Sequence, residues 1–171
     1  NSGDDTYATQ TFTITVNAVD DDPSVANAVA DFTVLEDASN STISYSNVFT
    51  DVDNDDNDIT KAVQSNSNTD LVSATISGNT LTLDYVANQY GTATITVRAT
   101  SNSLTVDDAF VVTVTGVNDE PSFTKGSNVT VNEDAGAQTV SGWASSLSKG
   151  TNDLSSQSLT FTVTNNNNSL F

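Results

Sequence analysis

The feature that most constrains the fold is an internal repeat. Residues 12–24 read FTITVNAVDDDPS and residues 110–122 read FVVTVTGVNDEPS, at a constant offset of 98 residues. Each copy alternates apolar and polar side chains, which is the period of a β-strand, and then enters an acidic stretch that ends on proline. We therefore interpret each copy as the last strand of a domain followed by the linker to the next domain.

The two copies divide the chain into three parts. Residues 1–22 are predicted to be the C-terminal strand and linker of a preceding repeat. Residues 23–120 are predicted to form a complete β-sandwich, and residues 121–171 the N-terminal half of a following one. A span of 98 residues between the copies is typical of a small domain with a core of its own.

The composition narrows the function classes. The chain has 22 Asp and Glu residues against four Lys and Arg, with a net charge of −18. Nucleic acids and anionic membrane surfaces both require a basic face, so neither is an expected partner, and no apolar run is long enough to insert into a membrane. Because the chain lacks Cys and His, thiolate metal sites and the common catalytic triads are excluded, and we expect no enzyme.

The middle part is predicted to be all-β. Apolar residues alternate with Thr and Ser, and clusters of Gly, Asn and Asp separate the runs. Seven short antiparallel strands with frequent turns are typical of an immunoglobulin-type sandwich. The predicted strands span residues 31–35, 42–48, 59–64, 71–77, 80–86, 92–100 and 107–115. The side chains predicted to face the core from the last three strands are Leu81, Leu83, Tyr85, Ala93, Ile95, Val97, Ala99, Phe110, Val112 and Val114.

The alternating strand directions place the acidic loops at the two ends of this sandwich. Residues 51–58, which include five Asp residues, are predicted to share one end with Asp20, Asp21 and Asp22. Glu36 and Asp37 are predicted at the opposite end, beside Asn118, Asp119 and Glu120.

The first acidic end is predicted to bind Ca²⁺. Asp51, Asp53 and Asp55 alternate, so their oxygens can point toward one position, and Ca²⁺ prefers six to eight oxygen ligands. The pattern is not an EF-hand, because its glycine and final glutamate positions hold Asp56 and Ala62. The simpler alternative is a solvated acidic loop. We favour Ca²⁺ because eight carboxylates at one end repel one another without a counter-ion.

The opposite end has a weaker signal. Glu36 and Asp37 recur as Glu133 and Asp134, each pair following a short apolar stretch. The alternative is an ordinary surface turn, but the recurrence favours a shared role in the junctions. The candidate metal ligands are therefore Asp20, Asp21, Asp22, Glu36, Asp37, Asp51, Asp53, Asp55, Asn118, Asp119, Glu120 and Glu133.

These motifs resemble tandem cadherin-like repeats of large bacterial surface proteins and adhesins. The resemblance rests on residues 117–121 (VNDEP), 35–38 (LEDA), 49–53 (FTDVD), 83–85 (LDY) and 90–97 (YGTATITV). It implies an all-β fold of tandem immunoglobulin/cadherin-like sandwiches whose junctions bind Ca²⁺. By this resemblance Glu36 and Asp119 would serve one junction, and Asp21, Asp51 and Asp53 the other. Two places differ from the pattern: Ser101-Asn102 replaces Asp-Gly, and Trp143 with Ser145-Ser146 replaces a second Asp-x-Asp.

The expected function is a calcium-rigidified spacer in a long secreted or cell-surface adhesin or extracellular fibre. Its expected partners are the neighbouring repeats of the same chain. One alternative is a module that binds carbohydrate or another surface polymer, for which Trp143 is the candidate aromatic residue. Another is an accessory module of a secreted enzyme.

The two ends of the chain allow two interpretations. Residues 1–19 contain a closing strand without its domain, and residues 121–171 contain opening strands, including residues 159–163, without closing ones. Either the chain is part of a longer array, or the N-terminal strand of one copy completes the C-terminal half of another by strand exchange.

Overall fold

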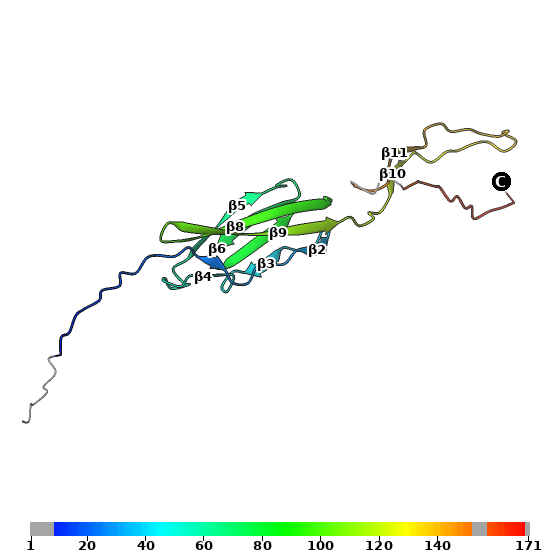
Figure 1. The fold of residues 1–171 in the computed structure, drawn as a ribbon. Helices are drawn as coiled ribbons and strands as arrows, with labels where there is room; N and C mark the ends of the chain where they lie inside the picture. Colours follow the sequence, from blue (N-terminus) through cyan, green and yellow to red (C-terminus); the bar gives the residue numbers. More distant parts are fainter. Residues whose placement is uncertain (1–8, 152–156, 170–171) are drawn as a thin grey trace, which may run out of the picture.

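The protein is all-β (Figure 1). The computed structural model describes residues 9–151 and 157–169, and these contain eleven β-strands. Within this part of the chain, no helix is long and apolar enough to cross a membrane.

Residues 24–115 form a sandwich, which we call the central sandwich. One sheet has four strands in the order β2 (Phe32–Leu35), β9 (Leu104–Thr115), β8 (Gly91–Ser101) and β5 (Thr60–Asn66). The other has three strands in the order β3 (Ser41–Ser44), β7 (Thr80–Tyr85) and β6 (Val72–Ser77). Two short strands, β1 (Ser24–Val25) and β4 (Phe49–Thr50), pair beside them. All seven predicted strands are confirmed, with shifted ends.

The core lies between the two sheets. Alternate residues of β7, β8 and β9 are buried, as the strand period predicts, and Tyr85 is the one predicted core residue of these strands that is only partly buried. Phe110 on β9 stacks on Phe32 of β2, with ring centroids 6.0 Å apart. Buried aromatic and aliphatic side chains of this size supply most of the stability of a small domain.

One pairing differs from the antiparallel prediction. β2 and β9 are parallel, with Phe32 opposite Val112 and Leu35 opposite Thr115. After β1 has paired with β4, residues 26–31 cross to the four-stranded sheet, so that β2 enters it in the direction of β9. Asp108 and Asp31 fix this crossing: the Asp108 carboxylate accepts a hydrogen bond from the Val29 N–H, and the Asp31 carboxylate accepts one from the Val111 N–H.

Two of the predicted strands are not regular strands within the described residues. Residues 12–16 are extended and largely exposed, and residues 159–163 have no strand pairing. Within the described residues neither stretch takes part in a β-ladder, and a strand is not stable without one.

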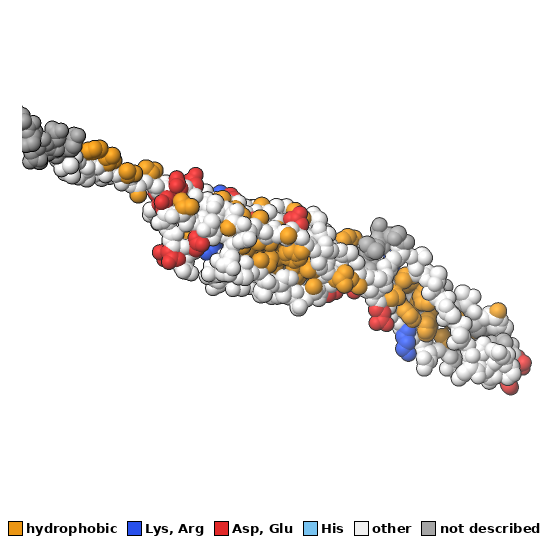
Figure 2. Space-filling view, turned by 60° about the horizontal axis from the view of Figure 1, so that its bottom comes forward, with side chains coloured by type: hydrophobic (Ala, Val, Ile, Leu, Met, Phe, Trp, Pro, Cys, Tyr) orange, Lys and Arg blue, Asp and Glu red, His pale blue; other side chains and the backbone are white. Residues whose placement is uncertain are grey.

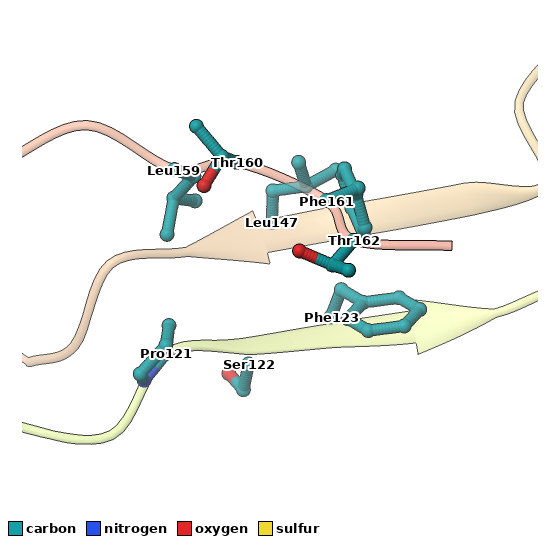
Figure 3. Close-up of a pocket in the computed structure, with 8 residues that line it drawn as sticks. All are labelled: Pro121, Ser122, Phe123, Leu147, Leu159, Thr160, Phe161 and Thr162. Atoms are coloured by element: carbon teal, nitrogen blue, oxygen red, sulfur yellow. The ribbon is translucent and has the colours of Figure 1, made fainter. Parts of the chain in front are cut away.

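Residues 159–163 instead contribute side chains to a small apolar cluster. This cluster covers β10 (Ser122–Lys125) and β11 (Ala144–Ser148), which form a separate two-stranded sheet. Phe123 meets Phe161 edge to face, with ring centroids 5.3 Å apart. Both rings line a pocket of about 180 Å³, together with Leu147 and Leu159 (Figure 3).

The internal repeat supplies a matched pair of variants for testing the core. Phe110 is 1% exposed, whereas Phe12, its counterpart at an offset of 98 residues, is 84% exposed. We expect Phe110→Ala to lower the free energy of unfolding by about 3–5 kcal/mol, because it leaves a cavity in the core. Phe12→Ala is expected to change it by less than about 0.5 kcal/mol. Urea unfolding measures both, and equal effects would contradict the assigned core.

Candidate functional site

The central sandwich has an acidic upper pole, formed by residues 51–58, the β6–β7 turn at residues 78–79 and the β8–β9 turn at residues 101–103. Figure 2 shows acidic side chains gathered at the end of the sandwich that adjoins the extended N-terminal stretch. β4 ends at Thr50, directly before Asp51, so the register of β4 with β1 places the start of the acidic loop. Residues 20–22 lie at this pole as predicted.

Asp51 is the most enclosed acid of the upper pole. The residue is 8% exposed, and its Oδ1 accepts hydrogen bonds from the N–H groups of Asp53 at 2.9 Å and Asn54 at 3.1 Å. The neighbouring Ser101 hydroxyl, followed by these N–H groups, holds the pKa of Asp51 below its usual value. Its Oδ2 is buried and makes no hydrogen bond of normal geometry within the described chain. A buried carboxylate oxygen of this kind requires a partner.

The N-terminal linker is bonded to the same loop. The Asp21 N–H donates to Oδ2 of Asp53 at 2.8 Å, and the Asn54 side-chain amide donates to Oδ1 of Asp20 at 3.0 Å. Asp22 is exposed next to them. The structure therefore brings the linker and the acidic loop together, as the strand directions predict.

The remaining loop carboxylates shape the loop itself. Asp56 accepts from the Asp51 N–H at 2.9 Å, and Asp55 accepts from the backbone and side chain of Asn57. Lys61 is the basic residue closest in sequence, but its ammonium group donates to the Ile59 carbonyl and to Asn79 Oδ1. Burial lowers the pKa of Lys61, and the charge of Asp56 opposes that shift.

The pole has suitable metal ligands, although its carboxylates face different directions. Among residues 9–151 and 157–169, no three acidic side chains converge as a metal-ligand group. Asp53, Asp55 and Asp56 each have one oxygen bonded to an N–H group. The available ligands fit a hard cation, since all are carboxylate, amide or backbone oxygens. In the described part of the chain, the buried Oδ2 of Asp51 also makes no hydrogen bond of normal geometry.

The opposite end, which we call the lower pole, comprises residues 36–37, 87–90 and 116–120. Glu36 is 5% exposed and one of its oxygens, Oε1, accepts from the Val117 N–H, while Oε2 is buried without a hydrogen-bond partner in the described chain. Asp37 accepts from the Asn88 N–H at 2.9 Å. These bonds confirm that residues 36–37 lie beside the exit from β9.

The linker at residues 118–120 is bonded to the region that follows it. The Gln157 side-chain amide donates to Oδ1 of Asn118, and the Thr151 N–H donates to Oδ2 of Asp119 at 3.3 Å. Glu120 is exposed. Glu133 is also exposed, between β10 and β11, and no hydrogen bond within the described residues joins it to this linker. The turn after Glu133 nevertheless matches that after Glu36, since Asp134 and Asp37 have φ values of 62° and 60°.

Sequence reasoning missed three participants of the upper pole: Asn54, Asp56 and Ser101. Asn54 and Asp56 lie within the acidic run, so the run itself was the available signal. The strand directions also place residues 101–106 at this pole, but Ser101 was noted as a departure from Asp-Gly and not as a member of the site. It is 3% exposed and next to Asp51. Strand direction brings the two loops to one end, and no local pattern indicates that these two side chains meet.

Trp143, the candidate sugar-binding aromatic residue, packs against residues 126–127 of its own chain. Its indole N–H donates to the Ser127 carbonyl at 3.0 Å, and its ring covers Gly126 so closely that a Cβ at Gly126 would lie 2.8 Å from Cδ1 of the ring. The packing of Trp143 against residues 126–127 accounts for its position next to β11.

The lowered pKa of Asp51 predicts a pH effect in metal-free solution. A carboxylate whose pKa is lower in the folded state stabilises the fold above its unfolded pKa, about 3.9, and this contribution is lost as the pH falls through the folded value. In EDTA, the melting temperature of Asp51→Asn is therefore expected to fall less than that of the wild type between pH 5 and about pH 2. Parallel melting curves across this range would contradict the assigned hydrogen bonds.

No protein-family profile matches the sequence, and no curated protein matches it. An endo-fucoidan hydrolase of glycoside hydrolase family 107 is similar in structure at 22% identity over 56% of this chain, with a TM-score of 0.40. The titin domains z1z2, solved in complex with telethonin, match 64% of this chain at 17% identity with a TM-score of 0.39. The chain spans 14% of the hydrolase and 55% of the titin chain.

Proposed function

We propose that this chain is a spacer segment of a long secreted or cell-surface protein, such as an adhesin or fibre, and that Ca²⁺ stiffens it. In this proposal residues 23–120 are one repeat of a tandem cadherin-like array and the neighbouring repeats are its partners. The segment holds other parts of the protein at a distance and performs no catalysis.

The observation that carries the proposal is the contact between the N-terminal linker and the acidic loop. Asp21 and Asp20 are bonded to Asp53 and Asn54, and beside them the buried Oδ2 of Asp51 makes no hydrogen bond of normal geometry within the described residues. Residues 20–22 and 51–58 together contain eight carboxylates. Such a concentration of like charge in a partly buried place favours the binding of a divalent cation.

Asp51, Asp53 and the linker residues Asp20 and Asp21 would hold the ion. Bound there, Ca²⁺ would supply positive charge that neutralises the carboxylates of the loop and the linker together. The linker would then be fixed against the central sandwich by ligands on both sides, in addition to two exposed hydrogen bonds. Exposed hydrogen bonds and charges contribute little by themselves, so the bound ion would determine the angle of the linker.

A thermal unfolding experiment tests the binding. Extracellular calcium modules bind with dissociation constants of about 10⁻⁴ to 10⁻³ M, and ion at 100 times that constant stabilises the fold by about 2.7 kcal/mol per site. We expect Ca²⁺ to raise the melting temperature of the chain by several degrees relative to EDTA. Mg²⁺ is expected to do so weakly, because it retains its water and requires octahedral geometry.

Two variants locate the effect. Asp51→Ala is expected to abolish most of the rise with Ca²⁺. Asp84→Ala removes the same charge from an exposed position on β7 and is expected to retain the rise. If Ca²⁺ leaves the wild-type melting temperature unchanged, or if both variants respond like the wild type, the acidic loop is solvated surface and the proposal is wrong.

A further inference from the structure

The strand pairings define equivalent positions in the two linker regions. Ser24 lies opposite Thr50 in the β1–β4 pair, and Ser122, at an offset of 98 residues, lies opposite Ser148 in the β10–β11 pair. The residues after these partners are therefore equivalent. Lys149 occupies the position of Asp51, and Thr151 occupies the position of Asp53. From the sequence, Ser145-Ser146 was expected there, but β11 is shifted because its pairing with β10 contains an irregularity between Ser122 and Thr124.

Among the described residues, two hydrogen bonds join linker to loop at each place, and one of them has opposite polarity at the two places. In the first, the linker N–H of Asp21 donates to the loop carboxylate of Asp53 at 2.8 Å. In the second, the loop N–H of Thr151 donates to the linker carboxylate of Asp119 at 3.3 Å. The other bond keeps its polarity: the side chain of Gln157 donates to Asn118, as that of Asn54 donates to Asp20. The second linker thus receives both of these bonds from the region that follows it, whereas the first linker receives one and donates one.

The charge of the segment beside the linker also differs between the two places. Residues 51–58 contain five Asp residues and face the three Asp residues of the first linker, so like charges meet. Residues 145–151 contain no acid and include Lys149, and they adjoin a linker with Asp119 and Glu120. The second linker therefore adjoins a segment of opposite charge, and in the register of the strand pairs Lys149 occupies the position of the buried Asp51 at the first linker.

We infer that Ca²⁺ binds at the first linker and that the second is held by the chain's own donors and the charge of Lys149. This inference rests on the proposed calcium-stiffened spacer and specifies which of its linkers respond to the ion. The residue that follows β4 or β11, Asp51 or Lys149, determines whether the adjoining linker binds Ca²⁺. An array built from both kinds of junction would have hinges at low calcium concentration only where this residue is acidic.

Calcium titration of the ¹⁵N-labelled chain, followed by backbone amide chemical shifts, tests the inference without a substitution. The amides of residues 20–22 and 51–58 are expected to shift, and those of residues 118–120 and 149–151 to remain in place. Shifts at both linkers would support the proposed function but overturn this inference. Oε2 of Glu36 at the lower pole, which is buried without a hydrogen-bond partner in the described chain, makes that outcome a real alternative. If no amide shifts, the proposed function and the inference are both wrong.

Charge exchange provides a second test by calorimetry. Asp51→Lys is expected to weaken the tightest Ca²⁺ site at least tenfold. Lys149→Asp is expected to add a Ca²⁺ site, whereas Lys125→Asp, the same charge change on β10, is expected to add none. Trp143 fluorescence checks that the variants retain the wild-type fold around β11. A folded Lys149→Asp variant with wild-type stoichiometry would overturn the role given to Lys149.

Discussion

The fold depends on one recurring interaction: a carboxylate that accepts hydrogen bonds from backbone N–H groups. Asp108 and Asp31 fix the crossing of residues 26–31 to β9 in this way. Glu36 fixes the exit from β9, and Asp51 and Asp56 shape the loop after β4. A chain without disulfides uses these bonds to close its loops, since hydrogen bonds to charged groups are stronger than neutral ones.

This use of acidic residues has an electrostatic cost. Of these carboxylates, those of Glu36, Asp51 and Asp56 lie at the two poles, and the described structure contains one ion pair, between Arg98 and Asp107 on neighbouring strands. The Arg98 guanidinium lowers the pKa of Asp107, but this pair lies on the exposed face of the sheet and is expected to contribute little. Most of the charge of −18 is therefore left to solvent and mobile cations. A divalent ion at the upper pole would compensate charge where it is most concentrated.

The features that depend on local periodicity and on strand direction could be predicted from the sequence. The strand spans, the buried face of residues 81–83, 93–99 and 110–114, and the grouping of loops at the two poles are confirmed. The parallel pairing of β2 with β9 was missed, because alternation of side chains does not specify the direction of a neighbouring strand. Residues 12–16 have a strand pattern without a strand, because strand formation requires a backbone partner. The position of Lys149 depends on an irregularity between β10 and β11 that no sequence pattern indicates.

The central claim is that a cation at the upper pole stiffens the linker, and backbone order at residues 20–22 measures this most directly. In EDTA these amides are expected to have ¹⁵N order parameters below about 0.6, the range of flexible backbone. In saturating Ca²⁺ they are expected to approach about 0.85, the value of rigid structure. Order parameters that remain low while Ca²⁺ is bound would show that the ion occupies the loop without fixing the linker, which would contradict the account.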